Sequence, residues 1–254
     1  MARIITAGHT LEYLWIDGAG PTLVFLHEGL GSIRQWRDFP AKVAHATGCR
    51  ALVYDRYGYG NSDVLREASV GVEFMHDGAL NELPELLENL EIEEPILIGH
   101  SDGASIALIH AGTYLARGVV TMAAHVFVED FGLTSIDNLN QAFETSDLPG
   151  RLGKYHRNAR KTFHLWADAW LDPAFRQWNI EEYLPRIKCP VLAIQGEGDQ
   201  YGSMAQLEAI GRQVGGPCEL LRLPDCGHSP HKDQAEVVLN SVSGFIKKII
   251  GPNP

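Results

Sequence analysis

Residues 96–104 read Ile-Leu-Ile-Gly-His-Ser-Asp-Gly-Ala, and this stretch decides the fold. An apolar run typical of a buried strand leads into the pattern Gly-x-Ser-x-Gly, with Ser101 at its centre. Glycines two residues before and two residues after the serine allow a backbone turn that would be too tight for Cβ atoms. Residues 104–111 then have the composition of a helix. The stretch predicts a sharp strand-to-helix turn that raises the Ser101 hydroxyl above a sheet.

The composition limits the classes of protein to which this chain can belong. The chain has 254 residues, of which 45% are hydrophobic and 21% charged, which suits one ordinary globular domain. It has no apolar run of the roughly 18 residues that a membrane span needs, and residues 1–9 do not resemble a signal peptide. A net charge of −11 argues against nucleic acid as a partner, because phosphates would repel it, and we interpret this charge as favouring solubility.

The cysteines bear on the compartment. Cys49, Cys189, Cys218 and Cys226 have no Cys-x-x-Cys spacing, which suits reduced thiols better than a disulfide framework. We therefore expect a cytoplasmic protein that does not contact membranes. The sequence leaves the oligomeric state open, a homodimer included.

Short apolar runs rich in β-branched residues alternate with amphipathic stretches along most of the chain. This alternation predicts an α/β fold, with about eight strands in a mostly parallel sheet and helices on both faces. The expected strands are 3–7, 11–16, 22–26, 51–54, 96–98, 118–122, 191–194 and 219–223, the first two joined by Gly8-His9. The expected helices are 34–47, 73–91, 102–115, 203–214 and 232–249.

One interval breaks this alternation. Residues 127–188 hold no convincing strand, but they are rich in Trp, Phe and Leu at helical spacing. We interpret 127–188 as a helical cap inserted into a core formed by 1–126 and 189–254, over the edge where α/β sheets bind ligands. Its aromatic residues, Trp166 among them, could roof an apolar pocket, although for any single one packing against the sheet is the simpler role.

A serine needs a base and an orienting acid. Asp199 follows the strand expected at 191–194, and His228 follows the strand expected at 219–223. The order Ser101, Asp199, His228 is the one that such sheets use for nucleophile, acid and base. In that arrangement His228 takes the proton of Ser101 during attack on a carbonyl, and Asp199 fixes the tautomer of the imidazole.

Other residues compete for these roles. Asp225 lies three residues before His228 and is the main rival acid, but it is local to the histidine loop. Glu129 and Asp130 follow the strand at 118–122 and are expected to line the entrance under the cap. His100 and His125 flank the site, where packing or a local hydrogen bond is the expected role. The thiol of Cys226 is expected to be buried and inert.

Taken together, these motifs resemble the α/β-hydrolase superfamily, of the capped type that acts on small molecules. Two further motifs carry the resemblance: Phe-Leu-His-Glu-Gly-Leu-Gly-Ser at 25–32 and Asp-Arg-Tyr-Gly-Tyr-Gly-Asn-Ser at 55–62. The resemblance covers essentially the whole chain. It implies a catalytic set of Ser101, Asp199 and His228, with the backbone N–H groups of Gly29 and Asp102 as an oxyanion hole.

Two positions depart from that family's pattern. Glu28 stands where a glycine is usual, and Tyr57 stands where proline is common. A carboxylate aimed at the oxyanion would repel it, so we expect Glu28 to point away and to bond neighbouring backbone or Ser32, with contact to a polar substrate group as the alternative. The carboxylate of Asp102 is expected to face solvent or the helix N-terminus. The candidate substrate-binding residues are Glu28, His125, Glu129 and Trp166.

No metal and no cofactor are expected. His228-Ser-Pro-His231 has the wrong spacing for a helical zinc motif, and Gly58-Tyr-Gly60 lacks the third glycine of a dinucleotide site. A serine nucleophile favours acyl transfer to water, so the predicted function is hydrolysis of a small-molecule carboxylic ester, lactone or thioester. C–C bond hydrolysis and cofactor-free oxygen chemistry remain open on the same scaffold, as does a ligand receptor that keeps the three residues.

Overall fold

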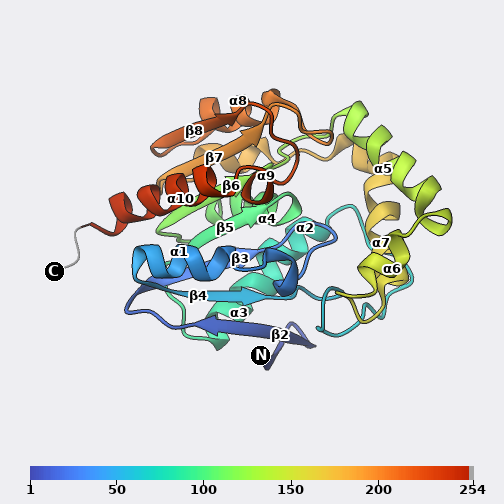
Figure 1. Cartoon of the computed structure of the whole chain (residues 1–254), viewed down its shortest axis with the longest axis horizontal. Coiled ribbons are helices and arrows are strands. Elements are labelled where there is room, and N and C mark those ends of the chain that lie inside the picture. The colour runs from blue at the N-terminus through green and yellow to red at the C-terminus, as the bar shows by residue number, and fades with distance from the viewer. Residues whose placement is uncertain (252–254) are drawn as a thin grey trace.

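The computed structural model describes residues 1–251. Its strands form one eight-stranded sheet in the order β1-β2-β4-β3-β5-β6-β7-β8 (Figure 1). The strands are β1 (Ala2–Thr6), β2 (His9–Ile16), β3 (Gly20–Leu26), β4 (Cys49–Tyr54), β5 (Ile96–His100), β6 (Gly118–Met122), β7 (Val191–Gly196) and β8 (Cys218–Leu223). β1 pairs antiparallel with β2, and β2 with β4, whereas all pairs from β4 to β8 are parallel. The predicted α/β fold class is confirmed.

Helices cover both faces because side chains alternate across each strand. Leu23 and Phe25 of β3 pack with α1 (Phe39–Thr47) and α10 (Ala235–Ile250) on one face. Val24 and Leu26 belong to the other cluster, which holds α3 (Leu83–Asn89), α4 (Asp102–Ala111) and α8 (Met204–Gln213). Figure 1 shows α1 and α10 on the near side of the sheet. Strands buried on both faces explain the continuous apolar runs in the sequence.

Several expected elements differ in detail. The helix expected at 34–47 is broken at Arg37, which has φ 54°, into the 3₁₀ turn η1 (Ile33–Trp36) and α1. The helix expected at 73–91 consists of α2 (Phe74–Asp77), the π-helical turn η2 (Gly78–Glu82) and α3. α9 (Pro230–Asp233) precedes α10. The β1–β2 turn lies at Ala7 and Gly8, which both have positive φ, one position earlier than expected.

The segment 127–188 is helical. It holds α5 (Asp130–Ala142), η3 (Phe143–Thr145), α6 (Leu148–Leu152), α7 (Ala159–Leu171), η4 (Pro173–Gln177) and η5 (Glu181–Arg186). Figure 1 shows α5, α6 and α7 beyond the end of the sheet toward which the β4 arrow points. The rings of Phe143 and Phe163 stack with centroids 3.8 Å apart and join η3 to α7. Its role as a cap stays a prediction.

Two further observations concern the described residues. All four cysteines are free, so no disulfide restrains the chain there. No helix between residues 1 and 251 is long and apolar enough to cross a membrane.

Candidate active site

Ser101 lies between β5 and α4 in a strained backbone conformation. Its φ of 52° and ψ of −122° are rare for a residue with a Cβ atom, and its backbone N–H donates to the Met122 carbonyl at 2.9 Å. A Cβ atom on Gly99 would come within 2.4 Å of the Ala104 Cα atom, and one on Gly103 within 2.1 Å of the Leu26 carbonyl oxygen. The two glycines are therefore required by close backbone contacts, as the sequence pattern predicts.

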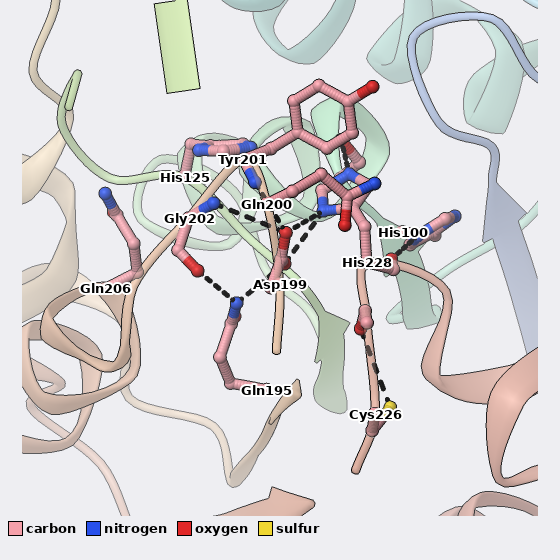
Figure 2. Close-up of polar contacts among 12 residues, drawn as sticks. His100, His125, Gln195, Asp199, Gln200, Tyr201, Gly202, Gln206, Cys226 and His228 are labelled. Carbon is pink, nitrogen blue, oxygen red and sulfur yellow. Dashed lines mark hydrogen bonds and ion pairs between the residues drawn. The ribbon is translucent and has the colours of Figure 1, made fainter. Parts of the chain in front are cut away.

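His228 and Asp199 complete a hydrogen-bonded chain with Ser101. The Ser101 Oγ atom lies 2.9 Å from His228 Nε2, and His228 Nδ1 lies 2.9 Å and 2.8 Å from the two carboxylate oxygens of Asp199. Figure 2 shows Asp199 between His228 and the backbone of Gly202. A carboxylate only accepts hydrogen bonds, so Nδ1 carries the proton and Nε2 is free to accept the proton of the Ser101 hydroxyl.

The two loops that carry Asp199 and His228 are joined by backbone hydrogen bonds. Gly198 N–H donates to the Cys226 carbonyl at 2.9 Å, and Glu197 N–H donates to the Leu223 carbonyl at 2.9 Å. A Cβ atom on Gly196 would lie 2.3 Å from the Cys226 carbonyl oxygen, which shows how closely the loops approach. This contact holds the imidazole and the carboxylate in register although 29 residues separate them.

The carboxylate of Asp199 is surrounded by donors. Besides His228, it accepts from Gln195 Nε2 at 2.8 Å and from the N–H groups of Tyr201 at 2.8 Å and Gly202 at 3.4 Å (Figure 2). Burial acts to raise the pKa of this carboxyl, but the hydrogen bond and charge of His228 outweigh it, and the pKa lies below its usual value. Asp199 is therefore ionised at neutral pH.

The two predicted oxyanion donors lie at the same cavity as Ser101. Gly29 and Asp102 both line this cavity, and neither backbone N–H has a hydrogen-bond acceptor within residues 1–251. A Cβ atom on Gly29 would lie 2.2 Å from Trp166 Nε1, so only glycine fits at this position. Free N–H groups beside a nucleophile are what an oxyanion hole requires.

The carboxylate of Asp102 was expected to face solvent or the helix N-terminus. It lies in the first turn of α4, but the expectation that it faces solvent is wrong. Asp102 is 1% exposed, and its Oδ2 accepts a hydrogen bond from the indole Nε1 of Trp166 at 3.1 Å. Burial raises the pKa of Asp102, against the lowering effects of the Arg56 charge and the Trp166 hydrogen bond. This bond ties α7 of the 127–188 segment to the residue that follows Ser101.

The cavity at Ser101 has a volume of about 160 Å³. All four candidate substrate-binding residues, Glu28, His125, Glu129 and Trp166, line it. Burial, followed by the charge of His228, lowers the pKa of His125 to about 3, so its imidazole is neutral near pH 7. The Glu129 carboxylate is held by Ser203 at 2.8 Å and 2.6 Å and by Gln206 at 2.8 Å, which leaves it little freedom to move toward a ligand.

Similarity to a known protein family extends over most of the chain. Residues 23–240 match the model of the alpha/beta hydrolase family. The chain belongs to this family.

Relatives and solved structures cover most of the chain. It is 26% identical over 273 residues to the dihydrolipoyllysine-residue acetyltransferase component of an acetoin cleaving system of Pseudomonas putida, covering 95% of this chain and 68% of that protein. It is 23% identical over 252 residues to 3-oxoadipate enol-lactonase 1 of Acinetobacter baylyi, covering 90% of each. The enol-lactonase structure from Burkholderia xenovorans superposes with a TM-score of 0.74 at 16% identity, covering 96% of this chain and 99% of that one.

Glu28 is the position where this alpha/beta hydrolase departs from the pattern expected for the loop after β3. Its carboxylate does not bond Ser32, as the sequence analysis expected, but lies 3.2 Å from His100 Nδ1 and 3.2 Å from Lys232 Nζ. His100 Nε2 in turn donates to the backbone carbonyl of His228 at 2.6 Å. Burial acts to raise the pKa of Glu28, yet its contacts with His100 and then with Lys232 hold it well below its usual value. Glu28 thus connects the Gly29 loop to the His228 loop.

The sequence analysis counted Trp170 among the aromatic residues that could roof a pocket without singling it out, and it did not name Tyr201. Trp170 and Tyr201 also line the cavity, and their rings lie 5.1 Å from the His125 ring and 4.8 Å from the His228 ring, respectively. Tyr201 follows Asp199 by two residues, a proximity that could have indicated it. Nothing in the local sequence separates Trp170 from the other aromatic residues of 127–188, because only the packing of α7 places it here.

The alternatives of the sequence analysis lie elsewhere. Asp225 is exposed, and Asp130 pairs with Arg176 on the surface. Cys226 is buried, and burial raises the pKa of its thiol to about 11. Among residues 1–251, no group of three or more His, Cys, Asp or Glu side chains is arranged to hold a metal ion.

Proposed function

We propose that this alpha/beta hydrolase cleaves small-molecule carboxylic esters, lactones or thioesters through an acyl-enzyme on Ser101. The observation that carries the proposal is the continuous hydrogen-bonded chain from Ser101 Oγ through His228 to Asp199. The free N–H groups beside it and the enol-lactonase relatives support the same chemistry.

The reaction follows from the protonation states. His228 Nε2 accepts the Ser101 proton as Oγ attacks the carbonyl carbon, and Asp199 stabilises the imidazolium that forms. The N–H groups of Gly29 and Asp102 hold the negative oxygen of the tetrahedral intermediate, and the loss of one such donor costs about 3–4 kcal/mol of transition-state stabilisation. His228 then protonates the leaving oxygen or sulfur. A water molecule, activated by the same imidazole, attacks the acyl group and releases Ser101.

The test is intact-mass analysis after treatment with a fluorophosphonate, on the wild type and on Ser101→Ala and His228→Ala. We expect one adduct on the wild type, no adduct on Ser101→Ala and much slower modification of His228→Ala. Ser105→Ala is the matched control, because Ser105 is a buried serine on α4 whose hydroxyl bonds the His125 carbonyl at 2.7 Å. A folded wild type without an adduct, or an adduct that persists in Ser101→Ala, contradicts the proposal.

A further inference from the structure

A second cavity lies beside the one at Ser101, and its volume of about 310 Å³ is roughly twice as large. It is bounded by the β1–β2 turn, the loop between β4 and α2, the turn η2 and helix α7. Trp166 lines both cavities and lies at the boundary that they share. Its indole is held there by its hydrogen bond to Asp102, the residue after Ser101.

The volumes bear on where a substrate fits. Pockets that enclose a small organic ligand usually measure about 300–1,000 Å³. The cavity of about 160 Å³ at Ser101 holds a reacting carbonyl and a short substituent but little more. The larger part of a medium-sized substrate therefore needs the second cavity. The π-helical turn η2, a rare element that occurs mostly at functional sites, forms part of its wall.

The reaction geometry indicates which part of the substrate enters. The leaving group must lie within hydrogen-bond reach of His228 Nε2, because the imidazole protonates it. None of the residues that line the second cavity comes from the loops of Asp199 and His228. The cavity instead adjoins Trp166, on the side of Asp102 and the oxyanion donors. With the leaving group directed toward His228, the acyl chain is the substituent left to point toward Trp166.

The lining indicates the chemistry of that chain. Tyr57, Tyr59, Leu65, Phe74 and Leu165 present rings and aliphatic groups. Arg56 is the buried arginine of the lining, and it is engaged only in part. Its Nη2 donates to the carbonyls of His27 and Glu28 at 3.3 Å and 3.1 Å, and its guanidinium lies 4.6 Å from the centroid of the Tyr59 ring, but its buried Nε has no hydrogen-bond partner within residues 1–251.

Acidic residues make the cavity unfavourable for an anion. The exposed side chains of Glu67 and Asp77 line it, together with the carboxyl of Glu82, whose burial raises its pKa to about 7. Resting on the proposed esterase function, we infer that the second cavity binds the uncharged, largely apolar acyl chain of a medium-sized ester, which passes Trp166 beside the reacting carbonyl.

The test fills the second cavity without touching the first. Ala169 on α7 lines only the second cavity, so Ala169→Phe reduces its volume, and Ala169→Ser is the matched control. Gly71→Trp fills it from the opposite side, and is compatible with the fold because a Cβ atom on Gly71 meets no atom within 4 Å. Circular dichroism and thermal melting verify that each variant is folded.

Three substrates are compared by kcat/KM: p-nitrophenyl acetate, p-nitrophenyl octanoate and the mono-p-nitrophenyl ester of suberic acid, which ends in a carboxylate. We expect the wild type to prefer the octanoate to the other two by about tenfold or more, since each buried methylene contributes to discrimination. The filled variants should lose about tenfold on the octanoate and stay within about twofold on the acetate. Ala169→Ser should behave as the wild type does.

The outcomes separate the two proposals. If folded filled variants keep the preference for octanoate, or lose acetate and octanoate activity equally, the assignment of the second cavity is wrong. A preference of the wild type for the suberate ester over the octanoate ester contradicts the assignment of an uncharged acyl chain. Fluorophosphonate labelling is measured on the same proteins. If Ser101 is labelled but the chain-length preference is unchanged in the filled variants, only the assignment of the second cavity is wrong. If Ser101 is not labelled in the wild type, both proposals are wrong.

Discussion

Replacement of Asp199 by asparagine tests the electrostatic logic of the site. Every group that contacts this carboxylate is a hydrogen-bond donor: the side chains of His228 and Gln195 and the backbone N–H groups of Tyr201 and Gly202. An asparagine brings one NH₂ group into this ring of donors. In one orientation the NH₂ group faces the N–H of Tyr201, which the backbone holds in place. In the other orientation it faces Gln195 and His228 Nδ1.

The second orientation is the less costly one, because a side-chain amide can flip whereas a backbone N–H cannot, although the flip of Gln195 gives up its bond to the Gly202 carbonyl at 3.0 Å. His228 Nδ1 would then accept from the new NH₂ group, and the ring proton would move to Nε2, where it blocks transfer from Ser101. A tautomer reversal of this kind lowers kcat by about 10⁴-fold, or about 5.5 kcal/mol at 1.36 kcal/mol per factor of ten. We expect Asp199→Asn to lose activity by this factor, with KM nearly unchanged.

Stability changes in the same variant. Loss of charge-assisted hydrogen bonds at a buried carboxylate lowers the free energy of unfolding by about 1–3 kcal/mol at neutral pH. The pKa of Asp199 is lowered in the folded state, so its contribution is present above the pKa of the unfolded chain and is lost as the pH falls through the folded pKa. The difference between wild type and Asp199→Asn should therefore shrink in acid.

The assay compares the wild type, Asp199→Asn and Asp225→Asn by hydrolysis of p-nitrophenyl esters and by the rate of fluorophosphonate labelling. Asp225→Asn makes the same chemical change three residues from His228, at an exposed position whose φ of 51° asparagine tolerates. It should retain wild-type rates. A folded Asp199→Asn enzyme within tenfold of the wild type, or an equal loss in Asp225→Asn, refutes the reasoning.

Three further predictions concern other parts of the chain. Glu28→Gln weakens the link between the Gly29 and His228 loops. The loss of one charge-assisted hydrogen bond of ~1.5 kcal/mol predicts a decrease of about tenfold in kcat without a change in KM. A change in KM larger than the change in kcat would instead indicate that Glu28 contacts the substrate. Burial raises the pKa of Glu82 to about 7, so the folded protein favours the protonated carboxyl, and the free energy of unfolding falls as the pH rises from about 4.5 to 7. In Glu82→Gln, chemical denaturation should show a smaller decrease of this free energy over the same pH range. An unchanged pH dependence would contradict the role of the Glu82 carboxyl. Gly103→Ala should give an insoluble or unfolded protein, since its Cβ would clash with the backbone. Gly244→Ala in α10 should instead raise the free energy of unfolding by up to ~1 kcal/mol, since its Cβ meets no atom within 4 Å. Thermal melting in which both variants behave alike would refute this contrast.

Local sequence determined much of the fold. The strands are continuous apolar runs because both of their faces are buried, and that pattern is visible without coordinates. Gly99 and Gly103 are needed at contacts between neighbouring segments, so the pattern around Ser101 predicted its turn. The positions of Asp199 and His228 directly after strands predicted that they approach Ser101, since the carboxyl ends of parallel strands share one edge of a sheet.

Contacts between residues far apart in the chain could be decided only by the tertiary structure. Glu28 pairs with Lys232, 204 residues away, and Trp166 donates to Asp102 across 64 residues. Neither contact can be recognised from the neighbouring sequence, because the spacing of residues along a helix is the same whichever surface the helix packs against. Trp166 of α7 lines both cavities, and its place there depends on the same packing. The sequence by itself predicted the candidate catalytic groups. The packing of α7 and the loops determined what surrounds these groups, because those contacts depend on side-chain shapes that meet only in the folded chain.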